Sequence, residues 1–233
     1  MNAYCFKDGR FFRDGRPVAE LRACPAGTDS VRALGDGIFE VTRTFSLAER
    51  ESVPEALALE IHTCFTPDFY EIPCVTYNGN RWGSGVEPQG LSANGQPWVY
   101  ASHRSSLPGC TYSEDGTDAV CLFGDPENPP FSMSMAQKEG GMRHILLLPQ
   151  VEKPIRYCAK AAYDAPLLPR LFMNGPVTLT AYVVLNPAAG RGLAIAKALE
   201  FGWRRFGHAT RPRFDPATLW RLGIRFARES VYF

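Results

Sequence analysis

The side chains best suited to ligand chemistry lie in two stretches rich in amides, charged groups and indoles, at residues 77–87 and 98–104. Sugars present flat apolar C–H faces and rims of hydroxyl groups. A sugar site therefore needs an aromatic plate surrounded by hydrogen-bond donors and acceptors. Trp82 is our candidate plate. The predicted ligand-binding residues are Asn78, Asn80, Arg81, Trp82, Glu87, Trp98, His103 and Arg104.

The same residues also have a purely structural interpretation. Asn-Gly-Asn at 78–80 is typical of a tight turn, because asparagine and glycine tolerate the left-handed backbone. In that interpretation Trp82 and Trp98 are core residues rather than ligand contacts. Both interpretations stay open from the sequence alone.

Signatures of several enzyme classes are absent from the sequence. It contains no GxSxG elbow, no P-loop, no HExxH motif and no complete GxGxxG fingerprint. Residues 190–192 resemble half of a phosphate cradle but lack the third glycine, so we predict a turn there. His103 lies close to Ser105 and Ser106 in sequence, which by itself gives no triad geometry. No catalytic residue is identified.

The cysteine pattern argues against a metal centre. The seven cysteines are scattered, no CxxC pair exists, and only His62 and Cys64 come close to metal-ligand spacing. We therefore expect buried, reduced thiols, no metal and no cofactor. The cysteines are Cys5, Cys24, Cys64, Cys74, Cys110, Cys121 and Cys158.

Composition narrows the class of protein. The 233 residues are 45% hydrophobic and 21% charged, with a formal net charge of +1, as in an ordinary globular protein. A net charge this close to zero provides no long-range electrostatic field to attract nucleic acid or an anionic membrane. No apolar run reaches the roughly 18 residues of a membrane span, and the polar N-terminus does not resemble a signal peptide. We expect a cytoplasmic protein that binds neither nucleic acid nor membrane.

Turn-forming and aromatic residues indicate the fold. The chain has 21 glycines, 19 prolines and 12% aromatic residues, which favours a large β-sandwich over a helical bundle. Alternation places Phe39, Val41 and Arg43 on one face of a strand, and residues 56–65 show a cleaner apolar face. We expect a mainly β fold, with two packed antiparallel sheets between about residues 31 and 185. Residues 67–108 are expected to form a long loop. Further expected strands lie at 119–123, 131–135, 144–148, 155–159 and 177–185.

Two helices are expected after the sandwich. Leu193, Leu199 and Trp203 recur at helical spacing along 194–206. Asp215 and Pro216 form a strong helix start, with aspartate as the N-cap. Because no stop signal follows this start, we expect a helical domain that continues beyond residue 233. The expected domains are a sandwich at 1–188, a linker helix and loop at 189–214, and the first helix of a helical domain at 215–233.

The order of these elements suggests a family. A β-rich region, the strand pair at 153–157 and 174–182, a linking helix and a capped second helix together resemble the N-terminal supersandwich domain of six-hairpin (α/α)6-barrel glycosidases and phosphorylases. The resemblance implies an oligosaccharide or glycoside substrate and a C-terminal helical domain that holds the catalytic carboxylate. It also implies that the loops 77–87 and 98–104 face the substrate.

The sequence thus leads to one main functional hypothesis and its competitors. The chain is expected to be the β-sandwich part of a carbohydrate-active enzyme, with at least one carboxylate of the catalytic pair outside it. The alternative is a non-catalytic carbohydrate-binding or domain-docking module. A third class is a small-molecule enzyme that uses Glu87 or His103. Seven arginines between 204 and 228 form either a solvated helix face or a surface for an acidic partner.

Overall fold

A computed structural model describes most of the chain. The residues that it describes are 3–46, 51–52, 57–77, 98–150, 156–158, 161–162, 172–173, 175–207 and 215–230. They fall into two compact units, residues 1–202 and 203–233.

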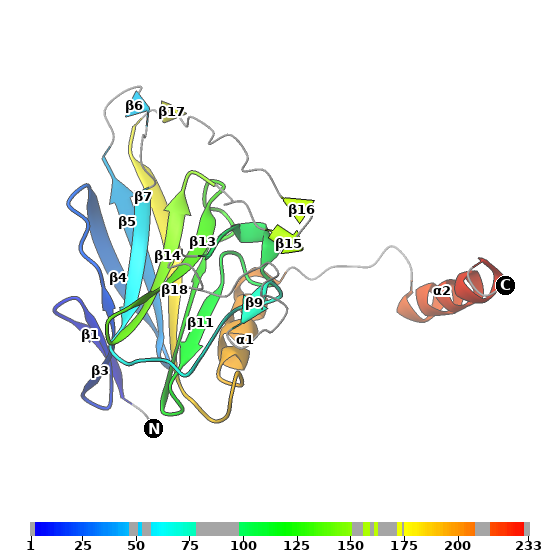
Figure 1. Ribbon diagram of the computed structural model, residues 1–233, viewed down its shortest axis with the longest axis horizontal. Helices are drawn as coiled ribbons and strands as arrows, with labels where there is room; N and C mark the ends of the chain where they lie inside the picture. Colours follow the sequence, from blue (N-terminus) through cyan, green and yellow to red (C-terminus); the bar gives the residue numbers. More distant parts are fainter. Residues whose placement is uncertain are drawn as a thin grey trace. The chain divides into compact units, whose positions relative to one another are not determined.

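The first unit is built from two seven-stranded antiparallel sheets (Figure 1). The first sheet has the order β1 (Tyr4–Lys7), β2 (Arg10–Arg13), β3 (Arg16–Leu21), β7 (Leu57–Thr63), β14 (Gly141–Leu148), β13 (Ser132–Lys138) and β10 (Trp98–Ala101). The second has the order β4 (Gly27–Gly35), β5 (Ile38–Phe45), β18 (Val177–Pro187), β12 (Asp118–Gly124), β11 (Thr111–Glu114), β8 (Phe69–Ile72) and β9 (Thr76–Tyr77). Two short pairs are β6 (Glu51–Ser52) with β17 (Phe172–Met173), and β15 (Arg156–Cys158) with β16 (Ala161–Ala162).

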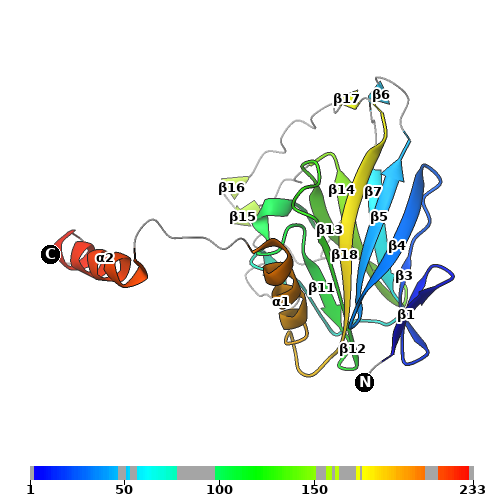
Figure 2. The same ribbon diagram turned by 180° about the vertical axis from the view of Figure 1, so that it is seen from behind.

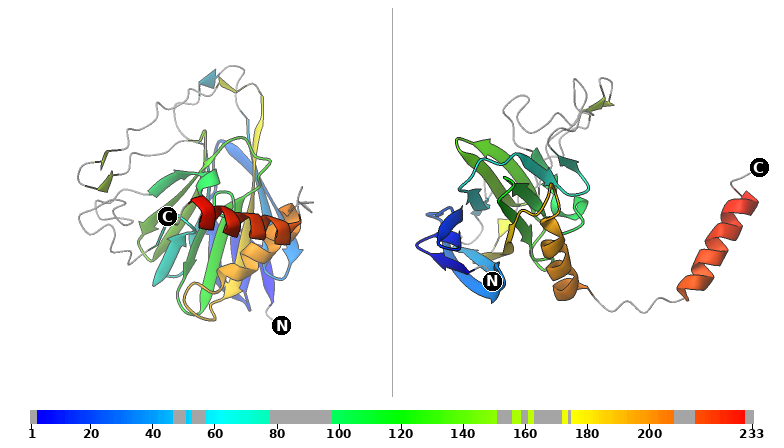
Figure 3. Two further views of the ribbon diagram at one scale, coloured as in Figure 1. Left: turned by 90° about the vertical axis from the view of Figure 1, so that its right-hand side faces the viewer. Right: turned by 90° about the horizontal axis from the view of Figure 1, so that it is seen from below.

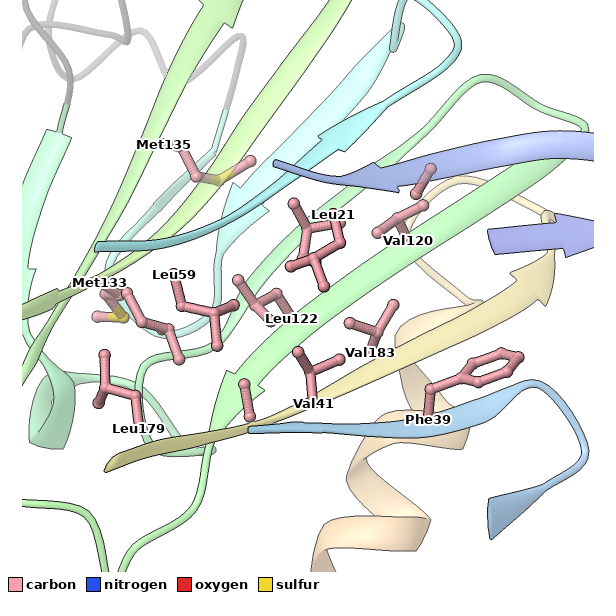
Figure 4. Packing of buried hydrophobic residues seen from close by; sticks show 14 of the residues in the cluster. Leu21, Phe39, Val41, Leu59, Val120, Leu122, Met133, Met135, Leu179 and Val183 are labelled. Carbon is pink, nitrogen blue, oxygen red and sulfur yellow. The ribbon is translucent and has the colours of Figure 1, made fainter. Parts of the chain in front are cut away.

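The sheets lie face to face, and the hydrophobic core fills the space between them. Strand β5 alternates strictly between half-buried and buried residues, as a strand with one face in the core must. Figure 4 shows Leu59 and Met133 of the first sheet beside Val41, Leu122 and Leu179 of the second. The predicted mainly β, antiparallel sandwich is therefore confirmed. Figure 2 shows the second sheet from its outer side.

The sheets begin earlier in the sequence than we predicted. Strands β1, β2 and β3 and the start of β4 all precede Val31. Their hairpins turn at Asp8-Gly9 and Asp14-Gly15, where all four residues have φ between 50° and 78°. Positive φ at both central residues is typical of the tight turns that match strand twist. The expected long loop at 67–108 is also partly wrong, because it contains β8, β9 and β10.

A buried arginine connects the two sheets of the sandwich. Arg43 is 1% exposed and donates two hydrogen bonds to the Asp29 carboxylate, of 2.6 and 2.7 Å. Its guanidinium also donates to the carbonyl oxygens of Ala58, at 2.8 Å, and Arg22. Since Ala58 belongs to the first sheet and Arg43 to the second, this one side chain connects the two layers.

Helix α1 (Ile195–Phe206) lies on the outer face of the second sheet (Figure 2). Its Phe201 ring centroid lies 6.0 Å from that of Phe123 and 5.2 Å from that of Tyr182. The buried residues of this helix are Ile195, Ala198 and Gly202. The apolar stripe that helical spacing predicted is not the buried face of this helix. Its residues Leu193, Leu199 and Trp203 are 64, 40 and 73% exposed.

Helix α2 (Pro216–Ser230) begins as predicted and is drawn in red in Figure 3. The Asp215 carboxylate accepts hydrogen bonds from the backbone N–H of Thr218, at 2.9 Å, and from its hydroxyl. This is an N-cap, which satisfies a backbone donor in the first turn. None of the helices in the described residues is long and apolar enough to cross a bilayer.

Candidate functional site

Of the sequence-predicted ligand residues, the structure describes Trp98, His103 and Arg104. Asn78, Asn80, Arg81, Trp82 and Glu87 lie outside the described residues, so their role stays a prediction. Trp98 begins β10.

His103 and Arg104 are described, in a short 3-10 helix that follows β10. His103 is exposed, and its Nδ1 lies 3.5 Å from Nε2 of Gln150. This helix sits near the Gly124 end of β12, since the backbone N–H of Gly124 bonds to Pro108 and that of Gly109 to Ser102.

The described start of the first predicted loop lies at the edge of the second sheet. Tyr77, in β9, pairs with Glu71 of β8 and is 47% exposed. Because β9 runs antiparallel to β8, the chain leaves Tyr77 in the direction of Asp68, which immediately precedes β8. The first predicted loop therefore starts toward the surface near Asp68.

A hollow of about 450 Å³ lies at this end of the sheet, and we call it the Asp68 hollow. Its volume is within the range of small-molecule sites. It lies at the Asp118 end of β12, because Ala188 bonds to Thr117. The seven residues of β12 span about 20 Å, so His103 belongs to the opposite end of the sandwich. The lining residues are Asp68, Glu114, Gly116, Ala188, Ala189, Gly190 and Arg191.

Glu114 holds the wall of the hollow in place. The residue is 2% exposed, and both of its carboxylate oxygens accept hydrogen bonds. One accepts from the Tyr112 hydroxyl at 2.5 Å, and the other from the backbone N–H of Gly192 at 2.8 Å. Burial and the neighbouring Glu114 carboxylate together raise the pKa of Tyr112 far above its ordinary value. Glu114 thus fastens the turn before α1 to the sheet.

The electrostatics of this face are dominated by carboxylates. Burial raises the pKa of Glu71 above its ordinary value, and the negative charge of Glu114 adds to the effect. The positive group at the rim is Arg191, whose guanidinium carbon lies 4.9 Å from the centroid of the Phe69 ring. This cation–π contact keeps an exposed donor group beside an aromatic ring.

Residues 190–192 form a turn before α1, as predicted. Gly192 has φ of +75°, and a Cβ there would lie 3.3 Å from Phe69. The turn therefore needs glycine for its backbone conformation, and a side chain would also press on the ring beneath Arg191.

We expect Gly192→Ala to lower the free energy of unfolding by about 1–2 kcal/mol, because alanine is strained at positive φ. Gly15→Ala is a matched control, since Gly15 has φ of +78° and no neighbour within 4 Å of its Cβ position. Urea denaturation measures both, and the excess for Gly192→Ala measures the contact with Phe69. An unchanged stability for Gly192→Ala would contradict the turn conformation.

The described residues also contain a serine–histidine contact, but it lies in the core. His144 is 0% exposed, with Nε2 at 2.8 Å from the Ser113 hydroxyl and Nδ1 at 2.9 Å from the Thr111 hydroxyl. Burial lowers the pKa of His144 to about 3, with a smaller contribution from His62, so the imidazole is neutral. A neutral ring offers one donor and one acceptor, which these two hydroxyls satisfy. The contact links the sheets and is closed to substrate.

The described part of the chain tests the expectation of buried thiols. Within the described part of the chain, no three metal-ligating side chains gather into a group. His62 bonds to Glu60 instead, at 2.9 Å. Among the cysteines whose side chains the structure describes, only Cys110 and Cys121 are buried, so the expectation of buried thiols is wrong for the exposed ones. The exposed cysteines are Cys5, Cys64 and Cys74.

The residues of the Asp68 hollow could not be identified from the sequence as a group. Glu71 and Glu114 come together only through the pairing of β8 with β11, which no local pattern reveals. The one local signal was the glycine-flanked Arg191 directly before a helix. Searches of protein-family models and of curated protein sequences find no match to this chain.

Proposed function

We propose that this chain is the β-sandwich part of a carbohydrate-active enzyme, a glycoside hydrolase or a phosphorylase. In this proposal the Asp68 hollow and the segment that follows Tyr77 contact the sugar. The antiparallel two-sheet architecture and the helices that follow it are consistent with the family resemblance of the sequence.

The observation that carries the proposal is the stacking of Arg191 on Phe69 at the rim of the hollow. Arg191 supplies hydrogen-bond donors and the Asp68 carboxylate supplies acceptors on the same rim, next to the Phe69 ring. Sugars require this combination, because each hydroxyl both donates and accepts while the ring carbons prefer apolar contact.

In the proposal the chemical step depends on carboxylates outside this chain. Cleavage of a glycosidic bond uses two carboxyl groups roughly 5–9.5 Å apart that flank the bond. Glu114 is unsuited to proton transfer, because both of its oxygens already accept hydrogen bonds. We therefore assign the catalytic pair to a C-terminal helical domain and sugar binding to the sandwich.

Isothermal titration of the protein with an oligosaccharide panel tests the proposal. We expect Arg191→Ala and Trp82→Ala each to weaken binding at least tenfold with little change in melting temperature. Arg10→Ala is the control, because Arg10 is an exposed arginine of β2 in the other sheet. Absence of binding to every glycan would contradict the proposal. Strong destabilisation by Trp82→Ala would return Trp82 to the core interpretation.

The second candidate function is a non-catalytic binding or docking module, and helix α2 favours it. Trp220 and Phe226 on this helix are 71 and 66% exposed, beside the basic Arg221 and Arg225. Exposed apolar residues flanked by arginines suit contact with an acidic protein partner. Hydrolysis or phosphorolysis of any glycoside by residues 1–233 alone would refute this candidate, and it would also contradict the assignment of the catalytic pair to another domain.

A further inference from the structure

Two buried cysteines lie within reach of each other on the outer face of the second sheet. Cys110, which directly precedes β11, and Cys121, in β12, have their sulfur atoms 3.5 Å apart. They are 0 and 2% exposed. In the register of the hairpin Cys121 faces Tyr112, so Cys110 and Cys121 occupy neighbouring positions on one face.

We propose that Cys110 and Cys121 form an oxidisable dithiol, which a small two-electron oxidant of the hydroperoxide class converts to a disulfide. A disulfide has a sulfur–sulfur distance of about 2.05 Å. The sulfur atoms must therefore approach by about 1.5 Å, a movement that side-chain rotation at a strand end can supply.

The oxidation balances without any other co-reactant. The sulfur of one deprotonated thiol attacks a peroxide oxygen and the O–O bond breaks. Hydroxide leaves and takes up the thiol proton as water, which gives a sulfenic acid. The second sulfur then attacks the first, the S–O bond breaks, and the hydroxyl group leaves with the second proton as water. Two thiols and one hydrogen peroxide thus yield one disulfide and two waters.

The buried environment of the two thiols makes this reaction slow in the folded protein. Burial raises the pKa of the Cys110 thiol well above its ordinary value, and the nearby Cys121 and Glu71 act in the same direction. The reactive thiolate is therefore scarce. Helix α1 packs on the same face of this strand, since the Phe201 ring centroid lies 6.0 Å from that of Phe123, two residues beyond Cys121.

Oxidation therefore depends on the docking of α1. When this helix lifts from the sheet, oxidant and water reach the sulfur atoms and the disulfide forms. The amount of disulfide therefore reports how often the helix has opened. The bond forms next to Tyr112, which with Glu114 fastens the turn before α1. The dithiol is thus placed to couple oxidation to the attachment of this helix.

Peptide mapping of the peroxide-treated full chain tests the proposal. Trypsin leaves both cysteines in one peptide, 105–138, because no lysine or arginine lies between them. After denaturation with N-ethylmaleimide and digestion, we expect this peptide to be unlabelled and two hydrogen atoms lighter. A further cut at Asp115 should leave its two halves linked. The species should form more slowly than the exposed Cys5, Cys64 and Cys74 are modified.

Three variants make the test decisive. Cys121→Ser must abolish the light peptide, and Cys64→Ser, which removes an exposed thiol, must leave it unchanged. Phe201→Ala, which loosens the cover, should speed its formation several-fold. The proposal is wrong if 105–138 keeps both thiols in the native chain and in Phe201→Ala after the exposed cysteines have reacted. It is also wrong if Cys110 and Cys121 are found bonded to other cysteines.

Discussion

Replacing Arg43 with methionine should lower the free energy of unfolding by about 3–5 kcal/mol, the largest single effect that we expect in this protein. The change leaves the Asp29 carboxylate and the carbonyl oxygens of Ala58 and Arg22 without their donor. Methionine fills a similar volume, so the cost arises mainly from the two carbonyl oxygens and the partly buried Asp29 carboxylate, which lose their hydrogen bonds. Urea denaturation at neutral pH measures it.

A matched arginine on the neighbouring strand provides the control. Arg32 of β4 also pairs with a carboxylate across the strands, that of Glu40, but its side chain is 65% exposed. Arg32→Met should cost at most about 1 kcal/mol. The double variant Arg43→Met/Asp29→Leu should recover part of the loss, because it removes the stranded charge. Equal effects of Arg43→Met and Arg32→Met would show that burial does not set the strength of the pair.

Acidification should destabilise the fold through His144, by about 1.4 kcal/mol for each pH unit below 6.5. The pKa of this histidine is about 3 in the folded protein and 6.5 as its ordinary value. Between these values the unfolded chain binds a proton that the folded chain does not. The stability is therefore complete above pH 6.5 and is lost as the pH falls toward 3. Urea midpoints between pH 7 and pH 4 measure this slope.

The variant His144→Gln isolates this contribution from the titration of carboxylates. Glutamine does not titrate, so its stability should fall less steeply with pH than that of the native chain, whatever its stability at pH 7. The slopes are compared rather than the absolute values, because glutamine cannot bond both Ser113 and Thr111 as the ring does. Parallel curves for the two proteins would contradict the assignment.

Local patterns predicted the local parts of this fold. Alternation placed Phe39, Val41 and Arg43 on one face, and all three are buried. The N-cap at Asp215 was equally readable, because a cap depends only on the next three residues. The hairpins at Asp8-Gly9 and Asp14-Gly15 also have a local signal, since Asp-Gly between short strands is typical of tight hairpins.

The parts that could not be predicted depend on contacts between distant segments. The pattern put Arg43 on the same face as Phe39 and Val41 but did not identify its acceptors, because Ala58 reaches it only through the packing of one sheet on the other. The Asp68 hollow likewise needs β8, β11 and the turn before α1 to meet. The two-residue period of a strand determines which of its side chains share a face, but it does not determine which strand pairs with it. The loop 77–87 remains a prediction.

The central position of β18 determines when this protein can complete its fold during synthesis. Strand β18 lies between β5 and β12, and Val184 pairs with Ile38. At roughly 5–20 residues per second, the ribosome needs on the order of 10 s or more to reach Pro187 after making β5. Until then β5 has an open edge that can pair with other chains. Such distant pairing also slows refolding. Expression at a lower temperature, or with a chaperone that shields nascent strands, should therefore raise the soluble yield.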